Sequence, residues 1–88
     1  MEMSEEEILA VVSEIARREL GYEGQLSLDA RLLEELELDS IRRLALAVAV
    51  ENRFRIILDP EEEAAIETVA DLVRSVAGKL EVREQEPS

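Results

Sequence analysis

Leu36-Glu37-Leu38-Asp39-Ser40-Ile41 joins a long irregular segment to a strongly apolar run that ends at Phe54. Asp39 is a good helix N-cap, so a helix is expected to begin at Ser40. The first backbone N–H groups of a helix are unpaired and its dipole is positive there, which favours a negatively charged substituent. The sequence therefore predicts that the Ser40 hydroxyl stands where a phosphate-linked group could be attached.

The run from Ser40 to Phe54 allows two interpretations. Its alternating Ala and Val residues resemble a strand with a period of two residues, whereas its continuous apolar character suits a central buried helix. The length of the run, its alanines and the cap at Asp39 favour the helix. We therefore expect a helix from Ser40 to Phe54.

The residues before this run predict one helix and a long connection. Apolar residues recur at helical spacing after a capping-box pattern at Ser4 and Glu7, and Gly21 is a natural C-cap, so a helix is expected from about Glu5 to Leu20. The connection from Tyr22 to Leu38 has no sustained period. Its scattered leucines predict that it is pinned across the core, with a helical turn around Ala30 to Leu33.

The residues after the run predict two further helices. Asp59-Pro60 is typical of a cap and a first helical position, so a short helix should end near Ile66. Thr68 is expected to cap a last helix that ends at Gly78. The predicted fold is all-α, a small four-helix bundle of three longer helices and one short one. Residues 1–80 should form the single domain and residues 81–88 a flexible tail.

Composition excludes several classes of function. The chain has 88 residues, of which 47% are hydrophobic and only 2% aromatic, so its core must be aliphatic. It has no His, Cys or Trp and a single lysine, which excludes Cys/His metal sites, thiol chemistry and His-based triads. An enzyme is therefore not expected.

Charge and hydropathy point to the kind of partner. The formal net charge of -12 would repel nucleic acid and anionic membrane surfaces. The longest apolar run, Leu44 to Val50, is far shorter than the roughly 20 residues that span a bilayer, and the acidic start is unlike a signal peptide. We expect a monomeric cytoplasmic protein that binds no nucleic acid and inserts into no membrane.

Several segments, in register from about Leu26 to Val76, resemble the acyl carrier protein family. Asp39-Ser40-Ile41 stands where that family has Asp-Ser-Leu before its second helix. The flanking matches are Leu32-Leu33-Glu34-Glu35-Leu36, Glu51 and Phe54, Leu58-Asp59-Pro60-Glu61, and Thr68-Val69-Ala70-Asp71-Leu72.

The resemblance implies a carrier whose Ser40 bears a 4'-phosphopantetheine arm, added from coenzyme A by a phosphopantetheinyl transferase. The arm would hold an acyl group as a thioester for synthases, ligases or transferases of fatty-acid, lipid or polyketide-type biosynthesis. Asp39 would cap the helix and help to position the transferase and its metal, although capping alone is an alternative. Two other functions stay open, an aminoacyl or peptidyl carrier and an unmodified helical protein-interaction domain.

The resemblance also implies a shelter for the acyl chain between the second and third helices. Carried over by position, its lining would be Leu46, Val50, Leu58, Ile66 and Leu72, although these residues could simply be core. Glu63 stands where the family usually has a small apolar residue, which changes the expected depth or shape of the pocket.

The surface after Ser40 departs from the family. Arg42 and Arg43 follow Ile41, and Ala45 takes a position that is usually Glu, so residues 39–55 hold four arginines against two acids. Electrostatic complementarity governs encounter rate and partner choice. We therefore expect Arg42, Arg43 and Ala45 to dock specialised partners and to suit general fatty-acid synthesis enzymes poorly. The alternative is that both arginines pair with the acids at 34, 35 and 37.

Overall fold

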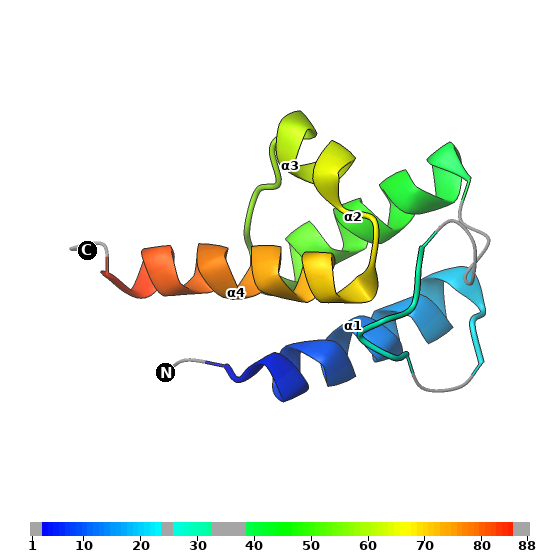
Figure 1. Cartoon of the computed structure of the whole chain (residues 1–88), viewed down its shortest axis with the longest axis horizontal. Helices are drawn as coiled ribbons and strands as arrows, with labels where there is room; N and C mark the ends of the chain where they lie inside the picture. Colours follow the sequence, from blue (N-terminus) through cyan, green and yellow to red (C-terminus); the bar gives the residue numbers. More distant parts are fainter. Residues whose placement is uncertain (1–2, 24–25, 33–38, 86–88) are drawn as a thin grey trace.

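The described part of the chain is a bundle of four helices. The computed structural model describes residues 3–23, 26–32 and 39–85, and the helices are α1 (Glu5–Leu20), α2 (Ser40–Phe54), α3 (Pro60–Ala65) and α4 (Val69–Gln85) (Figure 1). The predicted all-α fold is confirmed. The run from Ser40 to Phe54 is a helix and not a strand.

The predicted helix starts are confirmed by their hydrogen bonds. The Ser4 hydroxyl accepts from the Glu7 N–H at 3.1 Å, and the Glu7 carboxylate accepts from the Ser4 N–H at 3.1 Å. The Asp39 carboxylate accepts from the Arg42 N–H at 2.9 Å. Each bond satisfies a donor that the helix itself leaves unpaired, so these short-range signals determine where the helices begin.

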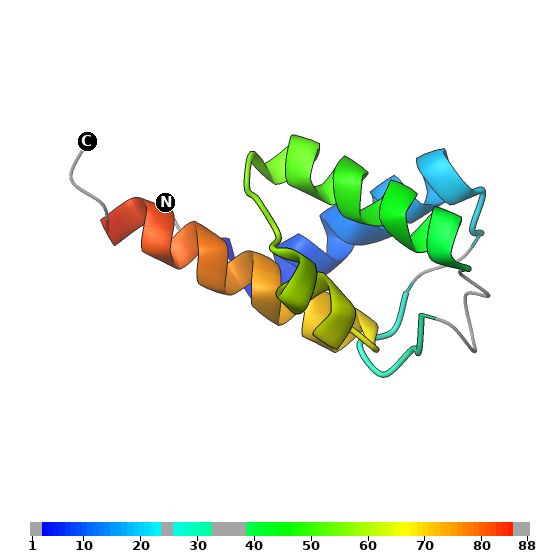
Figure 2. The same cartoon turned by 90° about the horizontal axis from the view of Figure 1, so that it is seen from above.

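The core lies between α1, α2 and α4, with α1 in contact with both of the others (Figures 1 and 2). The largest fully buried side chains are aliphatic: Ile8, Val12, Val50, Val69, Val73 and Val76. The short helix α3 buries none of its own side chains, whereas Leu58 before it and Ile66 after it are buried. The ends of α3 therefore attach it to the core. No helix in the described ranges has both the length and the apolar character to cross a membrane.

The connection between α1 and α2 is pinned to the start of α4, as predicted for its described residues. The N–H groups of Val69 and Ala70 donate to the carbonyls of Ala30 and Leu28, both at 2.9 Å, and the Leu32 N–H donates to Glu67 O at 3.0 Å. The first N–H groups of α4 have no partner within the helix, so the connection supplies acceptors for them.

The helical turn expected around Ala30 to Leu33 is described only in part, and Leu32 within it lies in a turn. An additional turn lies earlier, with the Ala30 N–H donating to Ser27 O at 3.1 Å, and Arg31 forms an isolated β-bridge with Thr68. Leu33 lies outside the described residues. The carbonyls of Leu28 and Ala30 accept from the first N–H groups of α4, so tertiary hydrogen bonds hold this segment in place.

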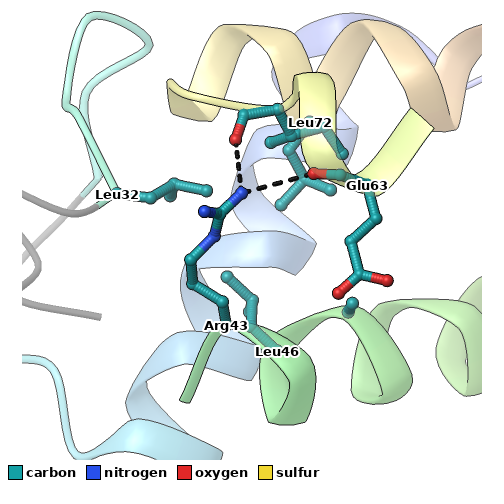
Figure 3. Close-up of a pocket in the computed structure, with 7 residues that line it drawn as sticks. Leu32, Arg43, Leu46, Glu63 and Leu72 are labelled. Atoms are coloured by element: carbon teal, nitrogen blue, oxygen red, sulfur yellow. Dashed lines mark hydrogen bonds between the residues drawn. The ribbon is translucent and has the colours of Figure 1, made fainter. Parts of the chain in front are cut away.

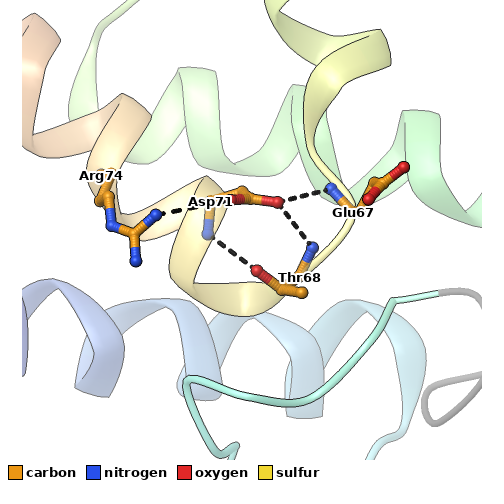
Figure 4. A network of polar contacts seen from close by, with 4 residues as sticks. All are labelled: Glu67, Thr68, Asp71 and Arg74. Atoms are coloured by element: carbon orange, nitrogen blue, oxygen red, sulfur yellow. Dashed lines mark hydrogen bonds and ion pairs between the residues drawn. The ribbon is translucent and has the colours of Figure 1, made fainter.

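A capping box also holds the start of α4 (Figure 4). The Asp71 carboxylate accepts from the N–H groups of Glu67 at 3.0 Å and Thr68 at 3.2 Å, and the Thr68 hydroxyl accepts from the Asp71 N–H at 3.1 Å. This confirms Thr68 as the cap. The Glu67 and Thr68 N–H groups stabilise the carboxylate and lower the pKa of Asp71.

Asp71→Asn is expected to lower the free energy of unfolding by about 0.5–1 kcal/mol at neutral pH, because a neutral amide accepts these bonds less strongly. The folded-state pKa of Asp71 is depressed, so its stabilisation is complete above the unfolded pKa and is lost as the pH falls through the folded pKa. The wild type should therefore lose more stability than the variant between about pH 7 and about pH 3 in urea titrations. Glu81→Gln removes an exposed acid on the same helix and serves as the control; equal acid sensitivity in both variants would refute the assignment.

The predicted helix end at Gly78 is wrong, because α4 continues through this residue to Gln85. Ala77 and Leu80 on either side pack against the core, so their burial outweighs the cost of about 1 kcal/mol for a glycine inside a helix. Residues 81–85 of the predicted tail thus belong to α4, and residues 86–88 lie outside those described.

Gly78→Ala is expected to raise the free energy of unfolding by about 0.5–1 kcal/mol. A Cβ atom added at Gly78 meets no atom within 4 Å, so the gain in helix propensity has no steric cost. Gly21→Ala is the matched control, because the C-cap Gly21 has φ 69 and alanine there should cost about 1 kcal/mol. Urea midpoints that shift in the same direction for both variants would contradict this explanation.

Candidate functional site

The start of α2 presents Ser40 to solvent. Ser40 is the first residue of α2 and is exposed, while Asp39 before it caps the helix through its carboxylate. The cap uses the aspartate carboxylate and does not involve the serine hydroxyl. A phosphate on this oxygen would lie at the positive end of α2.

An open groove of about 340 Å³ lies beside Ser40 and separates the start of α2 from α3. Its lining is Ser40, Arg43, Pro60, Glu63 and Ala64. A group attached to Ser40 therefore has room along this groove, between a cation, an acid and two small apolar surfaces. The residues present fit a phosphate-linked arm at this position.

A small apolar pocket lies next to the groove, between α2, α3 and α4 (Figure 3). Its volume is about 20 Å³, room for about one water molecule. Its lining is Leu32, Arg43, Leu46, Ala47, Glu63, Ile66 and Leu72. An acyl chain would therefore need this pocket to expand.

The pocket brings together three of the five residues predicted to shelter an acyl chain, namely Leu46, Ile66 and Leu72. Val50 and Leu58 are buried in the core and do not line it. Leu32 and Ala47 were not anticipated. Leu32 comes from the connection before α2, whose path depends on its hydrogen bond to Glu67, and no periodicity in the sequence signals that contact.

Arg43 points from α2 to the end of α3 (Figure 3). Its Nη2 atom donates to Ile66 O at 2.8 Å and to Glu63 O at 3.3 Å. These carbonyls lie at the C-terminal end of α3, where a helix leaves acceptors unpaired, and Glu63 O also accepts from the Ile66 N–H at 3.2 Å. The helical period indicates the inward orientation of Arg43, but not its partner, because Arg43 lies three residues before the buried Leu46 on the same face. The expected pairing of the arginines with acids 34, 35 and 37 falls outside the described residues.

A second contact holds α3 to α4. Lys79 Nζ lies 2.8 Å from Glu62 Oε1, and both side chains are about one third exposed. The hydrogen bond from Lys79 lowers the pKa of Glu62, and the same bond raises the pKa of Lys79. α3 is therefore joined to α2 through Arg43 and to α4 through Lys79.

An exposed apolar stripe continues along α2 from Ser40. The side chains of Ile41, Leu44 and Val48 are 79%, 54% and 45% exposed, and their spacing places them on one face of the helix. Contiguous exposed apolar side chains are typical of interaction sites. Arg42 and Ala45, predicted to dock partners, are exposed beside this stripe. The sequence prediction overlooked the stripe, although α2 has more apolar residues than one buried face requires.

Comparisons with known proteins agree on one family. A family profile described as a phosphopantetheine attachment site matches residues 10–76. An acyl carrier protein of Arthrobacter sp. (strain FB24) is 36% identical over 75 residues, 84% of this chain and 93% of the relative. A meromycolate extension acyl carrier protein of Mycobacterium leprae (strain TN) is 29% identical over 82 residues, 92% of this chain and 70% of the relative.

A solved structure has the same fold. It is described as an acyl carrier protein, Rv0033, from Mycobacterium tuberculosis, and it superposes with a TM-score of 0.77 at 24% identity. The match covers 81% of this chain and 96% of that chain.

Proposed function

The chain belongs to the acyl carrier protein family, and we propose that Ser40 is the residue to which its phosphopantetheine arm is attached. It is a carrier protein and not an enzyme. The observation that supports Ser40 is its exposed hydroxyl at the first position of α2, inside the matched range and at the edge of the groove.

Asp39 and the N-terminus of α2 have different roles in this proposal. The attached arm supplies a thiol that holds an acyl group as a thioester. Asp39 fixes the first turn of α2 through the Arg42 N–H, and the N-terminus of α2 favours the phosphodiester charge by about 0.3–1 kcal/mol. We also assign to the Asp39 carboxylate a role in positioning the transferase and its metal.

Incubation with coenzyme A and a promiscuous phosphopantetheinyl transferase, followed by intact mass measurement, tests the attachment. A mass gain of one arm is expected, and an unchanged mass would refute the carrier function. Intact mass of the protein from its own host would also identify the cargo, and an aminoacyl or peptidyl group there would favour the alternative carrier class. A cytoplasmic location stays a prediction.

We further propose that this is a specialised carrier within fatty-acid, lipid or polyketide-type biosynthesis. Partners that bind an acidic second helix need a basic surface. The apolar stripe and the exposed Arg42 instead suit a partner surface that is more apolar and less basic. The family includes a relative named for meromycolate extension, so members with a dedicated pathway exist among those similar to this chain.

Arg42→Glu is expected to raise kcat/KM about threefold to fivefold with a β-ketoacyl synthase of general fatty-acid synthesis, because exposed charge pairs each contribute about 0.2–1 kcal/mol. Arg43 is left unchanged because it is bonded to α3. Arg53→Glu makes the same charge change at the far end of α2 and is the matched control. Equal gains in both variants, or no gain in either, would count against specialised docking.

A further inference from the structure

We propose that Arg43 is a latch that closes the apolar pocket between α2 and α3, so that cargo on the Ser40 arm rests in the open groove. This inference rests on the proposed function. It concerns where the acyl chain lies, and it assigns to Arg43 the control of access to the pocket.

The position of Arg43 supports the latch. Arg43 lines both the groove beside Ser40 and the small pocket, so it stands between the attachment point and the apolar interior. Its Nη2 atom bonds Ile66 O, and the Ile66 side chain is itself a wall of the pocket with only 5% of its surface exposed. Moving α3 away from α2 to admit a chain therefore breaks these hydrogen bonds.

The way α3 is held to the bundle explains why the hydrogen bonds of Arg43 control the gap between α2 and α3. α3 buries none of its side chains, so its own apolar packing holds it weakly. Lys79 joins it to α4 through Glu62, and this ion pair does not cross the gap between α2 and α3. Arg43 crosses that gap, and loss of its bonds would leave Ile66 O without its charged donor beside an apolar chain, whereas Glu63 O keeps its bond from the Ile66 N–H at 3.2 Å.

The two volumes indicate where cargo rests. The pocket has about 20 Å³ and the groove about 340 Å³, with Ser40 on the groove. A chain on Ser40 reaches the groove without breaking any bond, whereas entry to the pocket requires the latch to open. A long acyl chain should therefore leave its thioester as exposed to solvent as a short one does.

The first test compares thioester exposure for two chain lengths. The transferase loads butyryl or dodecanoyl arms onto the wild type, Arg43→Met and the matched control Arg42→Met, and hydroxylamine cleavage is timed. Equal rates for both chains are expected in the wild type and in Arg42→Met. In Arg43→Met the dodecanoyl thioester should react about tenfold more slowly, which corresponds to about 1.4 kcal/mol of sheltering. Slower dodecanoyl cleavage already in the wild type, or equal rates in a folded Arg43→Met, would overturn the latch.

The second test needs no cargo and separates the latch from the proposed function. Amide hydrogen exchange of Glu63 and Ile66 in the unmodified chain should be about tenfold faster in Arg43→Met than in Arg42→Met, since opening of α3 would no longer break charged hydrogen bonds. Arg43→Lys, which keeps the charge, provides a second variant with an expected intermediate rate. Unchanged exchange would overturn the latch, whereas failure to load any arm would overturn the attachment at Ser40 and leave this measurement valid.

Discussion

Ser40→Ala is expected to abolish the mass gain from coenzyme A completely, while the free energy of unfolding changes by less than about 0.5 kcal/mol. The variant removes the proposed attachment oxygen. It leaves the Asp39 cap of α2 in place, because that bond runs to the Arg42 N–H and does not involve Ser40. Intact mass and a urea titration on the same sample measure both quantities.

Ser4→Ala is the matched control for this result, because Ser4 also stands at a helix start. Its hydroxyl belongs to the capping box of α1, so its loss should cost about 1 kcal/mol of stability and leave modification unchanged. The Ser40 variant should thus lose modification but keep its stability, and the Ser4 variant should lose stability but keep modification. A mass gain that persists in Ser40→Ala would place the arm on another hydroxyl.

The parts of the fold that could be predicted are those with local causes. The starts of α1, α2 and α4 follow from the caps Ser4, Asp39 and Thr68, and each cap acts within three residues of itself. Pro60 likewise begins α3 because its ring suits the first helical position. Each of these signals depends only on residues within a short stretch of sequence, so the same helix starts are found in the folded chain.

The features that could not be predicted depend on contacts between distant residues. α4 passes through Gly78 because Leu80 still packs on the core, and the Ala30 carbonyl accepts from the Val69 N–H, 39 residues later in the chain. Arg43 bonds a carbonyl 23 residues away, so neither its charge nor its neighbours in sequence reveal its partner. The proposed attachment serine has a local signature, whereas the latch proposed beside it depends on how α3 is placed.

Leu44→Asp and Ile41→Asp are each expected to lower kcat/KM of the transferase about 30-fold, because removal of an interface anchor costs about 2 kcal/mol or more. Both side chains are more than half exposed, and Ile41 directly follows Ser40. α2 has no acid in its first turn, so an aspartate at position 41 interacts favourably with the helix dipole. Ile41→Asp should therefore keep or slightly raise the free energy of unfolding while it weakens partner binding.

Val82→Asp is the matched control for these variants. Val82 is 58% exposed near the end of α4, at the opposite end of the molecule from the start of α2 (Figure 1). The substitution adds the same charge and removes a comparable apolar side chain, so any general effect of the change in charge on the transferase should appear here too. A rate loss confined to positions 41 and 44 would assign docking to the stripe. Equal losses at all three positions would show that overall charge, and not this surface, governs the encounter.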